Sequence, residues 1–208
     1  EKLLSEVGET YLSKAQRLSE KRAEAARRLT QRVEKELSTL GMKKTTFITS
    51  ISRLPMSKPS FEVQGVPVAP TGIDQVEFLI SPNVGEEPRP LSKIASGGEL
   101  SRIMLALKTV LAGRPSDKGA KSGQAPAGVP ILIFDEVDAG IGGATAEVIG
   151  RKLKEVSQAH QVLCVTHLPQ IAVHADAHYK VTKEATGGRT IVQVTKLSED
   201  ERVEEVSR

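Results

Sequence analysis

Ile131-Leu132-Ile133-Phe134-Asp135-Glu136 is the stretch that decides the fold of this 208-residue chain. It lies at the end of a short apolar run, residues 129–134, rich in β-branched side chains. Such a run predicts a strand that is buried on both faces of a parallel sheet. Asp135 and Glu136 then fall at its carboxyl end, the edge at which open α/β sheets place their ligands. The stretch therefore predicts an α/β fold with a ligand site beside these two acids.

Two neighbouring carboxylates at a strand end suit nucleotide chemistry. Asp135 is placed to hold Mg²⁺ on a nucleotide, and Glu136 to polarise an attacking water as general base. The alternative is a strand that simply emerges into solvent. The turn that follows argues against this alternative, because it combines Asp138 with Gly140 and Gly142, and glycine in a turn costs backbone entropy unless something approaches closely.

A second motif, Ser96-Gly97-Gly98-Glu99, precedes apolar residues at helical spacing and reads as a capping box that opens an amphipathic helix. An ordinary helix start is the alternative. Glycine at the first helical positions costs about 1 kcal/mol each relative to alanine, but it leaves the backbone N–H donors open to another group. Because a helix N-terminus also carries partial positive charge, this start suits a phosphate.

In this order the motifs resemble those of ABC-type ATPases. Residues 96–99 are similar to their signature motif, 131–136 to Walker B, 137–141 to the D-loop and 165–167 to the switch-histidine loop. Within that superfamily, residues 76–83, 95–108 and 134–143 resemble the SMC-like ATPases of bacterial DNA repair, and the resemblance covers residues 45–208. It implies the C-terminal lobe of an ABC/SMC-type ATPase head.

The resemblance also implies a role for each motif residue in ATP hydrolysis. Asp135 would hold Mg²⁺, Glu136 would activate water, and His167 would sense the γ-phosphate. Heads of this type sandwich ATP between two subunits, so the signature of one closes on the nucleotide of the other and Asp138 communicates across the dimer. The implied nucleotide-contacting residues are Ser96, Gly97, Gly98, Glu99 and Asp138.

One departure from the family pattern bears on activity. The chain has no G-x-x-x-x-G-K-[ST] phosphate loop, which the resemblance places in the N-terminal half of the head, before a long coiled coil. We therefore expect a segment that is inactive alone and needs that N-terminal half. The further partners implied are a second head in an ATP-dependent homodimer and double-stranded DNA, including its ends.

The pattern outside the motifs predicts two domains. Residues 1–44 form one long helical pattern with a narrow apolar stripe, typical of a coiled-coil strand, with Gly41 as its stop; a helix packed on its own domain is the alternative. Residues 45–208 form the lobe, which starts with a small antiparallel sheet. The polar, glycine-rich residues 113–130 predict a flexible loop.

The rest of the lobe alternates between helix and strand patterns. We expect a helix over residues 144–159 and a buried strand over 161–166, with His167 at its carboxyl end. A hairpin over 179–196, turning near Gly187-Gly188, and a last helix from Ser198 follow.

The composition constrains the expected binding partners and cellular location of the protein. A net charge of +3 is too small to indicate nucleic-acid binding by itself. A basic cluster in the long helix could contact DNA phosphates, but acidic residues lie between its members, so it can also be a solvated helix face; its residues are 27, 28, 32, 35, 43 and 44. The lone Cys164 permits no disulfide framework and is expected to be a buried thiol. With no membrane span or signal peptide visible, we expect a cytoplasmic, nucleoid-associated protein.

The resulting hypothesis is an ATP-binding and ATP-hydrolysing head segment that acts in DNA double-strand-break repair and recombination. Two alternatives stay open. One is the nucleotide-binding subunit of a membrane transporter, which shares these motifs but lacks a coiled-coil stub. The other is a tethering module that binds ATP as a latch without hydrolysing it.

Overall fold

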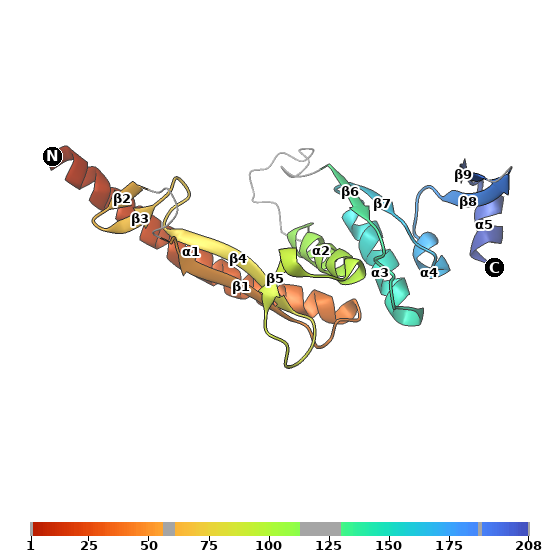
Figure 1. Ribbon diagram of the computed structural model, residues 1–208, viewed down its shortest axis with the longest axis horizontal. Helices are drawn as coiled ribbons and strands as arrows, with labels where there is room; N and C mark the ends of the chain where they lie inside the picture. Colours follow the sequence, from red (N-terminus) through yellow and green to blue (C-terminus); the bar gives the residue numbers. More distant parts are fainter. Residues whose placement is uncertain (1, 56–60, 113–129, 187–188, 208) are drawn as a thin grey trace. The chain divides into compact units, whose positions relative to one another are not determined.

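The computed structural model describes residues 2–55, 61–112, 130–186 and 189–207 (Figure 1). They form two compact units, Glu1–Ser38 with Met42–Ala95, and Thr39–Gly41 with Ser96–Arg208. Apart from Pro130, the predicted flexible loop lies outside the described residues. The boundary predicted between residues 44 and 45 stays a prediction.

The first unit contains the predicted long helix, α1 (Lys2–Thr39). It ends as its sequence indicates: Gly41 has a φ of +81°, and the Met42 amide donates to the Leu37 carbonyl at 3.0 Å. These are features of a Schellman-type helix end. Near its amino terminus Leu3 and Leu4 are exposed, and the coiled-coil role expected for this helix stays a prediction.

The predicted antiparallel sheet is present in the first unit. Strands β1 (Thr46–Arg53) and β4 (Asp74–Ser81) pair along their length, with Phe47 opposite Ile80. A short strand that the sequence did not reveal, β5 (Arg89–Pro90), joins β4 and gives the order β1-β4-β5. A second unforeseen pair, β2 (Phe61–Val63) and β3 (Val66–Val68), forms a hairpin, and the turn η1 (Leu91–Lys93) follows β5.

A buried carboxylate ties α1 to the rest of this unit. The Asp74 side chain is only 2% exposed. It accepts hydrogen bonds from Ser19 Oγ at 2.9 Å, Arg22 Nη1 at 3.2 Å and Arg53 Nη1 at 3.5 Å. Together with a small apolar cluster of Ala15, Val68 and Ile73, these bonds pack the first half of α1 on its own unit, which is the alternative considered for this helix.

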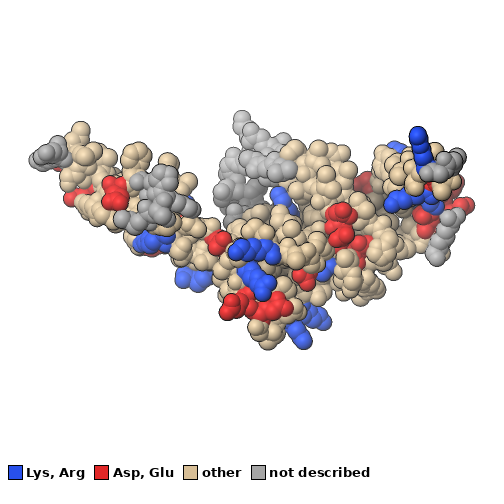
Figure 2. Space-filling model, in the orientation of Figure 1, with Lys and Arg blue, Asp and Glu red and all other residues tan. Residues whose placement is uncertain are grey.

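Charges of both signs are mixed along the first unit. Arg28, one of the basic residues of α1, bonds Glu24 at 2.6 Å with both side chains exposed, and Figure 2 shows blue and red residues interspersed over the face it presents. Exposed ion pairs of this kind are typical of a solvated helix face.

The second unit is built on a strand–helix–strand core. Strands β6 (Ile131–Phe134) and β7 (Gln161–Cys164) are parallel, and helix α3 (Gly143–Val156) connects them. Helix α2 (Gly97–Ala112), which carries the Ser-Gly-Gly start, contacts α3. The α/β fold predicted from the sequence is therefore confirmed (Figure 1).

After β7 the chain forms α4 (Pro169–Ala172), the antiparallel pair β8 (Tyr179–Thr186) and β9 (Arg189–Lys196), and α5 (Glu199–Val206). The hairpin and the last helix are confirmed, while the turn at residues 187–188 lies outside the described part. Ser198 caps α5 in a complete capping box with Glu201, and its hydrogen bonds lower the pKa of the Glu201 carboxyl.

One prediction about β6 is wrong. The strand was expected to be buried on both faces, but Ile133 is 71% exposed and Ile131 45% exposed, whereas Phe134 is buried. Successive side chains of a strand point to opposite faces, and the described residues cover only the side of Phe134. None of the described helices is long and apolar enough to cross a membrane.

Candidate functional site

The first turn of α2 is the starting point of the site. Ser96 Oγ accepts a hydrogen bond from the Glu99 amide at 3.3 Å, and the Ser96 carbonyl accepts from the Leu100 amide at 3.1 Å. The serine half of the predicted capping box is thus formed. It directs the amino terminus of a 16-residue helix toward the surface, where Ser96 and Gly97 are both exposed.

The two glycines of this turn lie against the acidic turn that follows β6. A β-carbon on Gly97 would come within 2.7 Å of Glu136 Oε2. A β-carbon on Gly98 would come within 2.8 Å of both the Ala139 β-carbon and the Glu136 carbonyl oxygen. Both distances are too short for a real contact, so a side chain at Gly97 would displace the flexible end of Glu136, and one at Gly98 would displace the backbone of the turn. The groups that approach in this structure are the chain's own Glu136 and Ala139.

Two further residues of α2, which the sequence reading missed, bind the same turn. Ser101 Oγ donates to the Asp135 carbonyl at 2.6 Å. Arg102 Nη1 donates to the Ala139 carbonyl at 2.9 Å and more weakly to that of Val137 at 3.4 Å. Arg102 is buried. Burial lowers the pKa of its guanidinium, and the nearby Glu99 carboxylate acts in the opposite direction.

A sequence signal for Arg102 does exist. It follows Gly98 by four residues and so lies on the same face of the helix as this glycine. An arginine on the face that packs most closely indicates that the surface opposite offers oxygen acceptors, since a buried guanidinium needs partners.

Asp135 and Glu136 both have exposed side chains at the carboxyl end of β6, as predicted. Glu136 has a φ of +55°, in the left-handed region that non-glycine residues rarely adopt. Backbone strain of this kind costs on the order of 1–3 kcal/mol and concentrates at functional sites. The hydrogen bond from the Ala139 amide to the Glu136 carbonyl, at 3.0 Å, helps to hold the turn.

The exposed carboxylate of Asp135 fits a single ligand of Mg²⁺, a cation that prefers oxygen and usually binds through one or two carboxylates plus nucleotide phosphates. Within the described ranges, no three His, Cys, Asp or Glu residues are grouped so that they could hold a metal ion. Asp135 thus suits a metal carried in by a nucleotide better than one held by protein side chains alone.

Asp138 and His167 are brought together from the ends of the two parallel strands. The Asp138 carboxylate is 4% exposed, whereas the His167 side chain is 76% exposed. Oδ2 of Asp138 accepts from Thr166 Oγ1 at 2.5 Å and from the His167 amide at 3.0 Å, and it lies 3.2 Å from His167 Nδ1. The structure therefore engages Asp138 within its own chain.

Cys164 lies beneath this group at the end of β7 and is only partly buried. Burial raises the pKa of its thiol to about 12, with the charges of Asp138 and Asp135 acting in the same direction. A neutral thiol is a poor nucleophile and metal ligand, so Cys164 has no part in the chemistry of the site.

Taken together, the lobe presents a Ser-Gly-Gly helix start, an acidic turn after one parallel strand and a histidine after the next. This arrangement defines the class: the signature-bearing half of an ABC-type ATPase head, as found in SMC-like proteins. Sequence comparison then shows which family within that class the chain matches. The chain belongs to the RecN family of DNA repair proteins.

The family assignment rests on sequence identity to curated relatives. The chain is 41% identical to DNA repair protein RecN of Bacillus subtilis over 211 residues, which is 100% of this chain and 34% of the relative. It is 45% identical to RecN of Treponema pallidum over 191 residues, 92% of this chain and 30% of the relative. The chain thus spans about a third of the length of the curated relatives it matches. No family model matches it.

Solved structures give only weak overlaps. A chain from a study of ATP-driven dimerization and DNA-stimulated activation of SMC ATPases has 16% identity and a TM-score of 0.43, covering 91% of this chain and 98% of its own length. The Smc head domain with coiled coil from Pyrococcus yayanosii has 18% identity and a TM-score of 0.49, with 90% and 29% covered. The fold assignment rests on the elements and motifs described above.

Proposed function

We propose that this chain is the signature-bearing half of an ATP-hydrolysing head that acts in DNA double-strand-break repair and recombination. One observation carries the proposal: Ser96-Gly97-Gly98, Asp135-Glu136 and His167 come from three separate parts of the sequence and gather in one lobe. Each has the chemistry that ATP hydrolysis needs.

Each side chain then has a defined task. The Asp135 carboxylate holds Mg²⁺, which supplies neutralisation of phosphate charge when bound. The Glu136 carboxylate accepts a proton from the attacking water as general base. His167, exposed after the neighbouring strand β7, contacts the γ-phosphate or the water.

The helix start explains why two heads would associate when ATP is bound. Ser96 and Gly97 at its start are exposed, and a helix N-terminus suits the γ-phosphate of a nucleotide held by a second head. Hydrolysis removes the phosphate that this contact recognises, so the dimer reopens. ATP-driven dimerisation is the expected consequence, with each head completing the site of the other.

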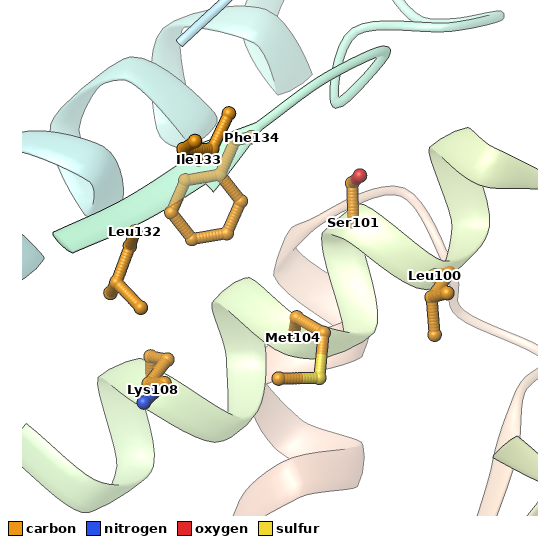
Figure 3. A pocket seen from close by; sticks show the side chains of 7 residues that line it. All are labelled: Leu100, Ser101, Met104, Lys108, Leu132, Ile133 and Phe134. Atoms are coloured by element: carbon orange, nitrogen blue, oxygen red, sulfur yellow. The ribbon is translucent and has the colours of Figure 1, made fainter. Parts of the chain in front are cut away.

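An uncovered apolar surface supports a further part of the proposal, that the N-terminal half of the same protein packs on this lobe. On one side of the β6–β7 pair, Ile133, Leu163 and Val165 are 71%, 47% and 62% exposed. An open hollow also lies between α2 and β6, and Leu100, Met104, Leu132 and Phe134 are among the residues that line it (Figure 3). Adjacent apolar side chains left in water favour association, and the N-terminal half would also supply the phosphate loop.

The DNA task is proposed from the relatives, whose names describe DNA repair proteins. The face shown in Figure 2 has acidic and basic residues interspersed and gives no separate electrostatic argument for duplex DNA or its ends. A protein with this task would work in the cytoplasm, at the nucleoid. We further propose that this segment alone neither binds ATP tightly nor hydrolyses it.

The test uses the full-length protein and the substitution Glu136→Gln, which keeps the shape of the side chain and removes the base. We expect ATP binding to persist, turnover to fall to background and the dimer to accumulate with ATP, as measured by light scattering. Glu155→Gln is the matched control, because Glu155 is an exposed acid on α3, and it should behave as wild type. Full-rate hydrolysis by the Glu136→Gln protein would overturn the assignment of the base.

The tethering alternative predicts a different result. A latch that only binds ATP would dimerise with ATP in the wild type and would show no phosphate release. The transporter alternative is disfavoured by the RecN relatives.

A further inference from the structure

The contact between Asp138 and His167 indicates a role for Asp138 other than communication across the dimer, which the family resemblance implies. Two hydrogen bonds converge on one carboxylate oxygen, from Thr166 Oγ1 and from the His167 amide, and His167 Nδ1 lies 3.2 Å from the same oxygen. All come from the loop that follows β7. A carboxylate that is 4% exposed is stable only when hydrogen bonds replace its lost water.

Thr166 extends this contact along the loop. Its hydroxyl donates to Asp138 at 2.5 Å and accepts from the Leu168 amide at 3.1 Å. The loop is therefore fixed at three successive residues, immediately before α4 begins at Pro169. On its other side the turn that carries Asp138 is bound by Arg102 of α2.

The chemistry of the carboxylate decides the tautomer of the histidine. An ionised carboxylate only accepts hydrogen bonds, so the ring nitrogen that faces it carries a proton. Which nitrogen of an imidazole is protonated follows from the hydrogen bond that the other one makes. With Nδ1 protonated toward Asp138, Nε2 is the nitrogen left for a ligand.

We propose that Asp138 is a positioning residue that fixes the orientation and the Nδ1–H tautomer of His167, so that Nε2 is presented to the reacting phosphate or water. The proposal rests on the proposed function for its catalytic consequence. The contact itself does not, because it joins two residues of one chain and is seen in the geometry alone. It also differs from a role across the dimer, which would require the carboxylate to leave its contacts with Thr166 and His167.

A double-mutant cycle in the full-length protein tests whether Asp138 acts through His167. We expect Asp138→Ala to lower kcat about 10- to 100-fold, the range typical of residues that orient a functional histidine, with KM for ATP changed less than threefold. Asp138→Asn retains an acceptor oxygen and should recover most of the loss. The double variant Asp138→Ala/His167→Ala should be no more than twofold slower than His167→Ala.

If the two substitutions instead multiply in the cycle, Asp138 acts independently of His167 and the proposal is overturned. A similar loss in Asp138→Asn and Asp138→Ala would also contradict it, because the acceptor alone would then not position the ring.

A second measurement does not depend on ATPase activity. In the ¹⁵N spectrum of full-length protein labelled at histidine, with His167 assigned from the His167→Ala variant, we expect the Nδ1–H tautomer in wild type and its loss in Asp138→Ala. An Nε2–H tautomer in wild type would overturn the proposal. A wild-type protein with no ATPase activity but the expected tautomer would overturn the proposed function and leave the positioning contact standing.

Discussion

Gly97 and Glu136 are separated by 39 positions in the sequence, yet the bare backbone of Gly97 lies directly beside the Glu136 carboxylate, where an added β-carbon would be 2.7 Å from Oε2. The signature helix and the proposed general base are thus in contact within one chain. Glu136 also has a strained backbone, with a φ of +55°. Its side chain is therefore placed by two constraints, its own turn and the helix start.

This contact predicts different outcomes for substitutions at the two signature glycines. In Gly97→Ala the obstructing atom is the end of a flexible side chain, so Glu136 can move and the fold should keep its stability, while turnover falls. In Gly98→Ala the obstructing atoms include the Glu136 backbone oxygen at 2.8 Å, so the turn itself must shift and the protein should also lose stability. Thermal unfolding and ATPase rates of the full-length variants check both.

Gly142→Ala is the matched control for these variants. No atom lies within 4 Å of the position that its β-carbon would take, and its φ of −169° is open to any residue. Unfolding and turnover should remain close to wild type. Equal stability losses at positions 97, 98 and 142 would contradict the packing described for the site.

Arg102 is predicted to be essential for the acidic turn. Arg102→Met keeps most of the buried stem but leaves the carbonyls of Val137 and Ala139 without their donor. Hydrogen bonds from charged groups contribute about 1.5–3 kcal/mol, so we expect a loss of about 2 kcal/mol in unfolding free energy. Arg151→Met is the control, because Arg151 is 63% exposed and pairs only loosely with Glu147 at 3.8 Å; it should change stability by less than about 0.5 kcal/mol.

Asp74 is predicted to hold the first half of α1 in place. Asp74→Ala removes the acceptor shared by Ser19, Arg22 and Arg53 and leaves two arginines without their buried partner. Amide hydrogen exchange over residues 11–22 should become at least tenfold faster. Glu24→Ala, which removes an exposed pair with Arg28, should leave this exchange unchanged, since exposed pairs contribute little. Unchanged exchange in Asp74→Ala would show that the apolar cluster alone holds the helix.

The Cys164 thiol should react slowly in the folded protein. With its pKa raised from 9.0 to about 12, its thiolate fraction at pH 8 is about a thousandfold smaller than in an unfolded chain, and the thiolate is the reactive form. The native alkylation rate should keep rising about tenfold per pH unit beyond pH 9, where the rate in urea levels off. Peptide mapping after iodoacetamide treatment measures both. Equal alkylation rates for folded and urea-unfolded protein at pH 8 would contradict the burial of the Cys164 thiol.

The sequence predicts those parts of the fold that depend on local pattern. The end of α1 at Gly41, the strands that contain Phe47 and Phe78, and the capping box at Ser198 all have local physical causes, and the structure confirms them. The short strand β5 and the β2–β3 hairpin were not foreseen. Strands of two or three residues show too little alternation to detect, and Pro67 within β3 argues against a strand.

The sequence shows the candidate residues of the site but not the contacts between them. A strand end, a glycine pair and a histidine are visible in the sequence, whereas the bond from Arg102 to Ala139 joins residues 37 positions apart. The burial predicted for Ile131 and Ile133 was wrong for a related reason. An apolar run predicts that its side chains are buried by packing, but it does not show which part of the protein packs on them.

The measurement that tests the central claim most directly is the ATPase rate of the full-length protein against increasing linear duplex DNA, in wild type and Glu136→Gln. An ATP-hydrolysing head coupled to DNA predicts a wild-type rate that rises with DNA and a Glu136→Gln rate at background throughout. A Glu136→Gln protein that hydrolyses ATP at the wild-type rate would contradict the account of the site. A wild-type rate indifferent to DNA would contradict its coupling to DNA repair.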